Sequence, residues 1–340
     1  MVTCFDGCSD LAYPAEFSVS ISRSEVTLAE VTTDFPFRSV KVCCHFGASA
    51  AAHFYKTINN SMALTRQKYT EVIGIASGKG GTGKTTVAVN LALSLQEKGF
   101  RVMLFDADLG LANAPILLGT RCPFNISHVM RGEKTLADIV VTTPQKLRLI
   151  SGASGNQALA GLTVLEVTQL VQAFSDLPDE LDYLIVDMAA GIAPSTLTLM
   201  AACHRRFIVM RNDPSSVADA YGTIKVLLED KLMDEIYLIP NAVKNKPTGE
   251  ELFQRINRVC AKFLTDTVRY AASIEMDDLI QDAHTHLQPL MTYAPTSQAA
   301  LDFRLLAQAV IELPAVQNPS GGVQFFINRW LPPHLSRDLH

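Results

Sequence analysis

Short runs of apolar residues alternate with longer amphipathic stretches along most of this chain. The apolar runs lie at residues 72–76, 102–105, 147–150, 183–186, 207–210 and 236–239. Their length is that of strands buried on both faces of a parallel sheet. Apolar residues recur at helical spacing in residues 87–95, 135–141, 162–174, 216–228 and 250–263. This alternation predicts an α/β fold with a doubly wound, mostly parallel sheet and helices on both faces.

The two ends of the chain do not share this pattern. Residues 1–61 hold four of the seven cysteines and many serines and threonines, without a sustained period of strand or helix. We expect this stretch to be a poorly ordered extension, or the functional chain to begin at Met62. The α/β pattern predicts a main domain over residues 62–318. Residues 319–340 begin with Pro-Ser-Gly-Gly, which predicts a linker to a short C-terminal segment.

The segment after this linker carries one amphipathic motif. Apolar residues recur at helical spacing at Val323, Phe326, Ile327 and Trp330. This predicts a short helix over residues 323–331. Aromatic residues suit a membrane surface, so one interpretation is peripheral contact with the inner face of the cell membrane. The alternative is a helix that docks on its own domain, and both can hold in turn if the docked helix is released.

A glycine-rich turn follows the first apolar run. Residues 78–85 read GKGGTGKT, which is the spacing of a P-loop. The glycines let successive backbone N–H groups turn inward around phosphates, and the following helix places its positive end behind them. Lys84 can reach the β- and γ-phosphates, and the Thr85 hydroxyl can ligate Mg²⁺. Because an apolar run precedes the turn and helical spacing follows it, the sequence predicts a site for a nucleoside triphosphate.

Aspartates end two further apolar runs. Asp106 and Asp108 follow residues 102–105, and Asp187 follows residues 183–186. In an open α/β sheet, ligands bind at the carboxyl ends of the strands. We therefore expect these carboxylates to meet the P-loop at one edge of the sheet, where their hard oxygen atoms suit Mg²⁺.

Charge and composition argue against several other classes of protein. The net charge is −5 and the sequence pI is about 5.9, so no global basic field attracts nucleic acid, and we expect no specific nucleic-acid binding. No apolar run reaches the ~20 residues of a spanning helix, and no secretory signal opens the chain. Scattered cysteines predict reduced thiols and a cytoplasmic protein. We expect Cys122, Cys203 and Cys260 to fill the core, and His284 and His286 to lie on the surface.

The second residue of the P-loop narrows the choice among the families that carry this motif. With Lys79 in GKGGTGKTT, the loop resembles the deviant Walker A motif of the MinD/ParA class of dimerising ATPases. Four further stretches resemble the FlhG/FleN flagellar-number ATPases of that class, in family order: FDADLGLANAPILLG, DYLIVDMAAGI, PSSVADAY and VQFFINRWL. The resemblance covers residues 70–331. It implies a P-loop NTPase fold of the SIMIBI/MinD type for the main domain.

The resemblance implies catalytic roles for three residues. Lys79 would cross a dimer interface and contact the nucleotide held by the partner subunit, so that two subunits close around two ATP molecules. Lys84 would hold the β- and γ-phosphates, and Asp108 would position or polarise the attacking water. ATP and Mg²⁺ are then the cofactors, and the reaction is Mg²⁺-dependent hydrolysis of ATP to ADP and phosphate.

The resemblance also implies ligands for the metal ion and the nucleotide. Asp106 and Asp187 would orient Mg²⁺ through water, beside Thr85, and Gly191 would sense the γ-phosphate. The residues implied for nucleotide binding are Gly78, Lys79, Gly80, Gly81, Thr82, Gly83, Lys84 and Thr85, with Thr86 at the α-phosphate and Asn241 at the edge of adenine.

We therefore expect an ATP-dependent dimerising switch that controls flagellar number or placement near a cell pole. The implied partners are a second copy of the chain and an SRP-type flagellar GTPase resembling FlhF, a flagellar transcription activator resembling FleQ, or flagellar switch-complex proteins. One alternative is a ParA-type partition ATPase that acts on DNA or another polar cargo. Another is an interaction protein that binds nucleotide without hydrolysing it.

Overall fold

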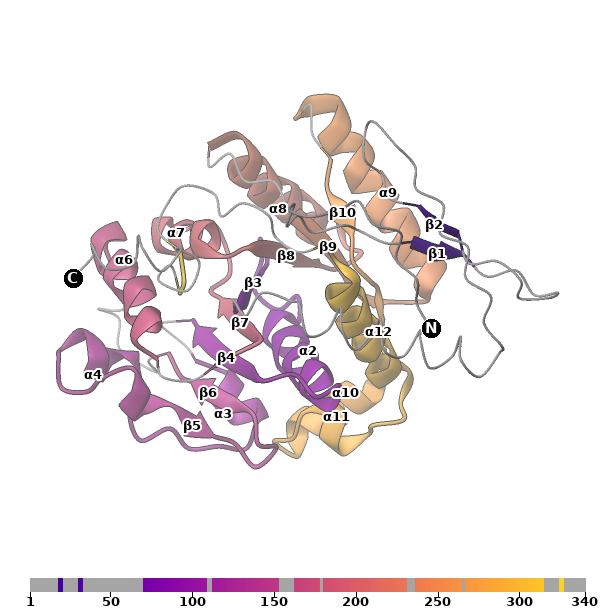
Figure 1. Cartoon of the computed structure of the whole chain (residues 1–340). Helices are drawn as coiled ribbons and strands as arrows, with labels where there is room; N and C mark the ends of the chain where they lie inside the picture. Colours follow the sequence, from indigo (N-terminus) through magenta and orange to yellow (C-terminus); the bar gives the residue numbers. More distant parts are fainter. Residues whose placement is uncertain are drawn as a thin grey trace, which may run out of the picture. The chain divides into compact units, whose positions relative to one another are not determined.

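The computed structural model describes residues 18–20, 30–32, 70–108, 112–152, 162–177, 180–230, 236–264, 267–314 and 324–326. The chain divides into two compact units, Met1–Gln67 and Lys68–His340. In the first unit, β1 (Ser18–Ser20) pairs antiparallel with β2 (Glu30–Thr32). Met62, the expected functional start, lies outside the described residues. The second unit holds the sheet and helices that position the candidate site (Figure 1).

A nine-stranded sheet forms the centre of the second unit. Its strand order is β10-β9-β8-β3-β7-β4-β6-β5, and β11 also pairs with β9. β5 pairs antiparallel with β6, and the other pairings are parallel. The strands are β3 (Glu71–Ala76), β4 (Val102–Ala107), β5 (Val141–Thr142), β6 (Arg148–Ile150), β7 (Tyr183–Met188), β8 (Arg205–Met210), β9 (Ile236–Val243), β10 (Arg269–Tyr270) and β11 (Ile274–Glu275). The predicted mostly parallel sheet is confirmed.

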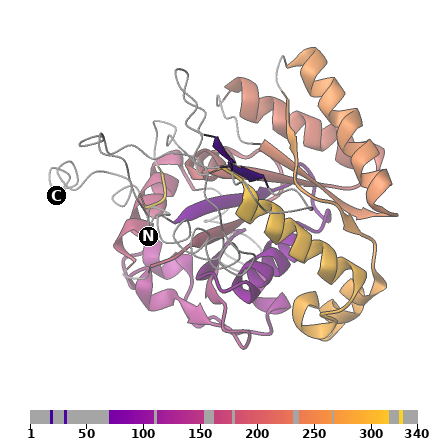
Figure 2. The same ribbon diagram turned by 45° about the vertical axis from the view of Figure 1, so that its right-hand side comes forward.

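Helices cover both faces of this sheet (Figures 1 and 2). Strand residues alternate between the faces, so Leu104 of β4 joins one core and Phe105 joins the other. One layer contains α2 (Lys84–Glu97), α3 (Ala114–Leu117), α10 (Asp278–Thr285), α11 (Leu290–Tyr293) and α12 (Gln298–Glu312). The other contains α4 (Ile126–Met130), α6 (Val164–Ala173), α7 (Pro194–Ala202), α8 (Pro214–Lys225) and α9 (Lys246–Phe263). None of the described helices has the length and apolar character needed to cross a membrane.

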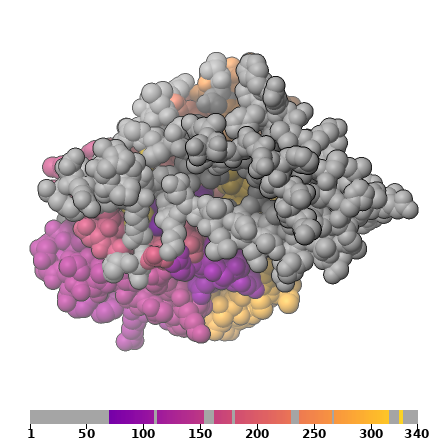
Figure 3. Space-filling model, in the orientation of Figure 1, coloured from indigo at the N-terminus to yellow at the C-terminus, as the bar shows by residue number. Residues whose placement is uncertain are grey.

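The helix α12 packs along α2, far away in the sequence (Figure 2). Phe303 and Leu306 of α12 are buried in the same core as Leu91 of α2. At the rim, Arg304 holds Glu97 through two hydrogen bonds of 2.7 and 2.9 Å. In the space-filling view, the purple surface of the segment with α2 borders the orange surface of α10–α12 (Figure 3). The C-terminal helices of the unit therefore support the helix that follows the P-loop.

The starts of the helices differ in how their free N–H groups are used. At the start of α8, the Asp213 side chain accepts from the backbone N–H of Ser216 at 2.9 Å. At the start of α6, Thr163 and Glu166 form a reciprocal capping box. Such caps contribute about 1 kcal/mol each. In contrast, Gly83, the residue before α2, has no side chain to cap the helix, which leaves its first N–H groups for a ligand.

The structure departs from the predicted helix over residues 135–141. A single 3₁₀ turn covers Ala137–Ile139, and Val141 already belongs to strand β5. Val140, between them, has an extended backbone. Branching at Cβ lowers the helix propensity of valine and favours strands. Pairing with β6 therefore prevails over the helical spacing here.

The C-terminal segment forms a turn at residues 324–326, the part of it that the structure describes. Phe326 has a φ of 57°, a left-handed conformation that a right-handed helix excludes. Phe325 and Phe326 are fully buried, and their ring centroids lie 4.9 and 6.0 Å from that of Phe174. An uninterrupted helix through Phe326 is therefore excluded, and residues 324–326 dock on their own domain. The linker, Val323 and residues 327–331 lie outside the described residues.

Candidate functional site

The P-loop connects β3 to α2, and glycine is required at several of its positions. Gly81 and Gly83 have φ angles of 78° and 91°, which side-chain-bearing residues rarely adopt. A Cβ on Gly78 would lie 2.3 Å from the backbone oxygen of Asp219 in α8. A Cβ on Gly80 or Gly81 would meet nothing within 4 Å. The loop is thus packed against α8 on one side and open on the other.

The side chain of Asn241 contacts the backbone of this loop. It lies in β9 and is 8% exposed, and its Nδ2 donates to the backbone oxygen of Thr82 at 2.7 Å. A Cβ on Gly83 would come within 2.3 Å of the same nitrogen. The amide therefore braces the turn that starts α2. Its predicted contact with adenine remains a prediction.

Lys84 and Asp187 form the buried ion pair of the site. Lys84 lies in the first turn of α2 and Asp187 near the end of β7, and Nζ lies 3.2 Å from Oδ1. The Thr85 hydroxyl lies near enough to this carboxylate to lower its pKa. Burial raises the pKa of the fully buried Asp187, while Lys84 and Thr85 counteract that rise. Its Oδ2 has no hydrogen-bond partner among the described residues.

Asp106 lies beside Asp187, because the two are register partners on the adjacent parallel strands β4 and β7. It is fully buried, and its two oxygens accept from the backbone N–H groups of Asp108 at 3.1 Å and Ala114 at 2.9 Å. Burial, followed by the charge of Asp187, raises its pKa. Two adjacent buried carboxylates with one lysine favour an additional cation.

The donor set at this point fits Mg²⁺. Asp187 presents a buried carboxylate oxygen that has no hydrogen-bond partner in the described part of the chain, and the nearby Thr85 hydroxyl lowers the pKa of the same side chain. Asp106 uses both oxygens for backbone N–H groups, which suits contact through a water rather than direct ligation. All three groups offer hard oxygen atoms, which Mg²⁺ prefers.

Gly152 is a site residue that the sequence pattern did not reveal. A Cβ there would lie 2.7 Å from the backbone oxygens of both Asp106 and Asp108. Any larger residue would displace the segment that carries these aspartates. Its only signal in the sequence is its place just after the apolar run at residues 147–150. Asp108 itself is partly buried, and residues 109–111 lie outside the described residues.

Lys79 is exposed and lies on the N-terminal end of α8. Its Nζ donates to the Ser215 hydroxyl at 2.7 Å, and that hydroxyl donates to Asp213 at 2.8 Å. The pKa of Asp213 is lowered by the Ser216 backbone N–H and the Ser215 hydroxyl first, and by Lys79 to a smaller extent. Contacts of this kind between exposed groups contribute only about 0–1 kcal/mol to stability. Little free energy is therefore lost when Lys79 breaks its bond to Ser215.

Two further predicted residues flank the phosphate cradle. Gly191, with a φ of 91°, donates its N–H to the backbone oxygen of Ser77 at 2.9 Å. Thr86 is 8% exposed, and its Oγ1 lies 3.2 Å from Nε2 of His284. The prediction that His284 lies on the surface holds only in part, because its ring is partly buried and faces Thr86 of α2.

The remaining cysteines and histidine follow the prediction in part. Cys203 and Cys260 are buried, and Cys122 is partly exposed. Burial raises the pKa of Cys203 to about 12, so its thiol is chemically quiet. His286 is exposed and stacks on Tyr293 with ring centroids 5.0 Å apart.

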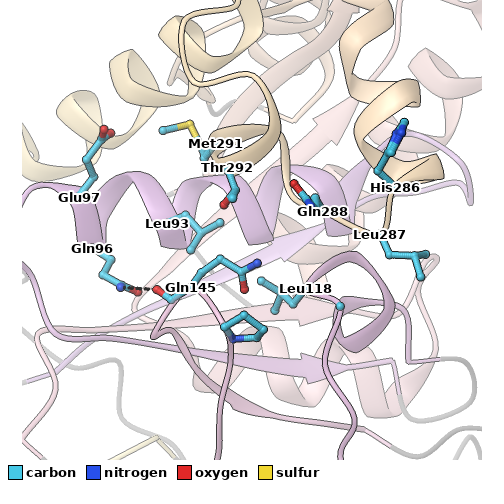
Figure 4. Close-up of a pocket in the computed structure, with 12 residues that line it drawn as sticks. Leu93, Gln96, Glu97, Leu118, Gln145, His286, Leu287, Gln288, Met291 and Thr292 are labelled. Atoms are coloured by element: carbon cyan, nitrogen blue, oxygen red, sulfur yellow. Dashed lines mark hydrogen bonds between the residues drawn. The ribbon is translucent and has the colours of Figure 1, made fainter.

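A separate cavity of about 680 Å³ lies at the C-terminal half of α2 (Figure 4). Leu93 and Gln96 of α2 form one wall, and residues 286–288 and Met291 form another. Gln145 points into it from the β5–β6 turn, and its backbone oxygen accepts from Gln96 at 2.9 Å. No residue of the P-loop lines this cavity, so it is distinct from the nucleotide site.

Comparison with known proteins agrees with this geometry. A family model described as ParA, NUBPL iron-transfer P-loop NTPase, matches residues 68–311. The solved structure of the septum site-determining protein MinD complexed with Mg-ADP from Pyrococcus horikoshii has a TM-score of 0.61 and 24% identity, over 74% of this chain and all of that one. At that identity the likeness shows the fold alone, and it confirms the MinD-like α/β architecture.

Two curated relatives match most of the chain. The chain is 38% identical over 259 residues to the antiactivator FleN of Pseudomonas aeruginosa, covering 76% of this chain and 92% of FleN. It is 34% identical over 266 residues to the flagellum site-determining protein YlxH of Helicobacter pylori, covering 77% and 90%. With a P-loop, a buried lysine–aspartate pair and these matches, the chain belongs to the ParA/MinD family of P-loop NTPases, in the part of that family that includes FleN and YlxH.

Proposed function

We propose that this protein is an ATP-dependent dimerising switch that controls flagellar number or placement. The observation that carries the proposal is the convergence of Lys84, Asp187 and Asp106 beneath the open P-loop. This arrangement serves a triphosphate and a divalent cation. The flagellar part rests on the likeness to the antiactivator FleN and to YlxH.

Nucleotide binding would use the backbone of the P-loop and the uncapped start of α2. The ammonium group of Lys84 would interact with the β- and γ-phosphates as well as with Asp187. Thr85, Asp187 and, through water, Asp106 would hold Mg²⁺, which supplies positive charge that offsets the triphosphate. Asn241 would keep the loop in the conformation that receives the phosphates.

Hydrolysis and dimerisation would depend on Asp108 and Lys79. Asp108, at the carboxyl end of β4, would accept a hydrogen bond from the attacking water and aim it in line. Lys79 would exchange Ser215 for the nucleotide of the partner subunit. Because the present contact is exposed, this exchange costs little free energy. ATP would thus close the dimer, and hydrolysis would reopen it.

The output of this switch would be contact with flagellar proteins. The candidates are an SRP-type GTPase resembling FlhF, a transcription activator resembling FleQ, or switch-complex proteins at the pole. The C-terminal segment would add peripheral membrane contact once dimerisation releases it.

Phosphate release from ATP and Mg²⁺ tests the enzymatic part of this proposal. We expect slow turnover by the unmodified protein and a loss of about 10²-fold or more in Asp108→Ala, which keeps the P-loop intact. If both release phosphate equally slowly, the protein is a nucleotide-dependent interaction protein rather than an enzyme. ATP-dependent DNA retention that weakens between low and high salt would instead support a partition ATPase.

A further inference from the structure

The α10–α11 segment contacts the P-loop helix α2 at two residues, Thr86 and Asn90. His284 of α10 places Nε2 3.2 Å from the hydroxyl oxygen of Thr86. Asn90 of α2 donates to the backbone oxygen of Thr86 at 2.8 Å and accepts from the backbone N–H of Met291 at 3.0 Å. Asn90 is 2% exposed, so these bonds lie away from water. The segment is thus bonded to α2 beside the ring of His284, which faces Thr86 in the first turn.

The hydroxyl of Thr86 has one proton to give. If the ring of His284 accepts that proton at Nε2, the hydroxyl cannot donate to a phosphate. If Nε2 carries the hydrogen and donates, the hydroxyl proton is free to point away from the ring. The tautomer of His284 therefore decides which way Thr86 donates.

We propose that His284 is a positioning residue for the α-phosphate of the bound nucleotide. Its Nε2–H donates to Thr86 Oγ1, and the Thr86 hydroxyl in turn donates to an α-phosphate oxygen. This inference rests on the proposed nucleotide site and adds to it a residue from α10. No proton is transferred, because the two hydrogen bonds only orient the donors.

Burial is consistent with a ring that stays uncharged in this role. Desolvation lowers the pKa of His284, so a single ring nitrogen carries hydrogen at neutral pH. The second histidine of this segment, His286, is exposed and has its Nδ1 near the backbone oxygen of Asp282 at 2.8 Å. It has no part in the contact and serves as a matched control.

Calorimetric titration of the full chain with ADP and Mg²⁺ tests the proposal. We expect His284→Leu, which keeps volume and loses the donor, to weaken ADP binding about 3- to 10-fold. His284→Gln, whose amide nitrogen can replace Nε2, should restore most of the affinity. His286→Gln should bind as the unmodified protein does. Thermal unfolding of each variant without nucleotide shows that the folded state is retained.

A second experiment tests whether His284 acts through the hydroxyl of Thr86. Thr86→Val should weaken ADP binding by a similar factor, and adding His284→Leu to it should have no further effect. On addition of ADP, the ¹⁵N shifts of the His284 ring should move toward the Nε2–H tautomer. An ADP affinity of His284→Leu equal to that of the unmodified protein would overturn the inference and leave the nucleotide site standing.

Two other outcomes are also decisive. If the losses of ADP affinity in Thr86→Val and His284→Leu multiply in the double variant, His284 does not act through Thr86, and the inference is overturned. If the unmodified protein bound no ADP at all, the proposed function would fall, and this inference with it. An effect of His284→Leu on ATP but not ADP would place the ring at the γ-phosphate and contradict its role.

Discussion

At the scale of single residues, His204 is a histidine that folding keeps neutral. It is 4% exposed, and its Nδ1 accepts from the backbone N–H of Val72 at 2.9 Å. Burial, followed by the charges of Arg206 and Arg205, lowers its pKa to about 3. The unfolded chain binds this proton near its ordinary pKa of about 6.5, and the folded chain does not. His204 therefore contributes stability at neutral pH that is lost as the pH falls below about 6.5.

The variant His204→Asn measures this contribution, because its side-chain oxygen can still accept from Val72. The free energy of unfolding of the unmodified protein should fall relative to the variant by about 1.4 kcal/mol for each pH unit below about 6.5. Urea unfolding at about pH 7.5, 6.5 and 5.5 provides the measurement. Parallel stability curves for the two proteins would show that His204 takes up its proton in the folded state.

Asn241 is a residue to which the structure adds a second role. Its place at the edge of adenine stays a prediction, and its amide nitrogen donates to the backbone oxygen of Thr82 in the P-loop. Asn241→Ala removes this bond from a buried carbonyl, which costs about 1–3 kcal/mol of stability. We expect weaker binding of ATP and GTP by the same factor, measured by calorimetry. A changed ratio of the two affinities would show that Asn241 also reads the base.

At the scale of elements, the apolar pattern predicted strands more reliably than short helices. The six predicted strands all form, because each is a contiguous run that the sheet buries on both faces. Residues 135–141 did not follow their spacing, because a short helix has too few bonds to offset its nucleation. The pairing of Val141 with β6 supplied the competing interaction.

The C-terminal segment shows the same limit. Its spacing favoured a helix, but the left-handed backbone at Phe326 and the contacts of both phenylalanines with Phe174 produce a docked turn. Buried aromatic side chains of this kind each contribute about 2–3 kcal/mol. Any membrane contact by Phe325 and Phe326 therefore requires their release from the domain.

Liposome flotation tests that release. We expect the full chain to float with anionic vesicles in the presence of ATP and Mg²⁺, and to remain largely unbound without nucleotide, when the phenylalanines are docked. A chain that ends at Gly321 should remain unbound in both conditions. Equal flotation of the full and shortened chains would exclude the segment as the membrane contact.

At the scale of the whole molecule, the residues of the site lie together at the carboxyl ends of neighbouring strands. The P-loop follows β3, Asp106 and Asp108 end β4, and Asp187 lies near the end of β7, all on parallel strands that are neighbours in the order β3-β7-β4. Parallel pairing puts these carboxyl ends side by side. Lys79 is exposed at the same edge, where a second subunit could meet it.

Light scattering tests dimerisation through this edge. We expect the mass to double with ATP and Mg²⁺ in Asp108→Ala, in which the ATP state persists. Lys79→Ala, added to that variant, should keep it monomeric. Lys98→Ala is a matched control, because Lys98 is exposed and bonds Gln308 at 2.9 Å at the far end of α2. A dimer that forms without the Lys79 charge would remove this lysine from the interface.

The local sequence was sufficient to predict the P-loop, the strands and the aspartates at their ends. Those features depend on the backbone preferences of neighbouring residues and on the direction of parallel strands. Packing between distant segments decided the rest: Thr86 meets His284 across 198 positions, Asn241 meets Thr82 across 159, and Lys79 meets Ser215 across 136. Gly152 and the docked phenylalanines belong to the same group. Contacts of this kind arise only when the whole core is assembled, because no short-range period in a sequence encodes which distant side chain will fill a given space.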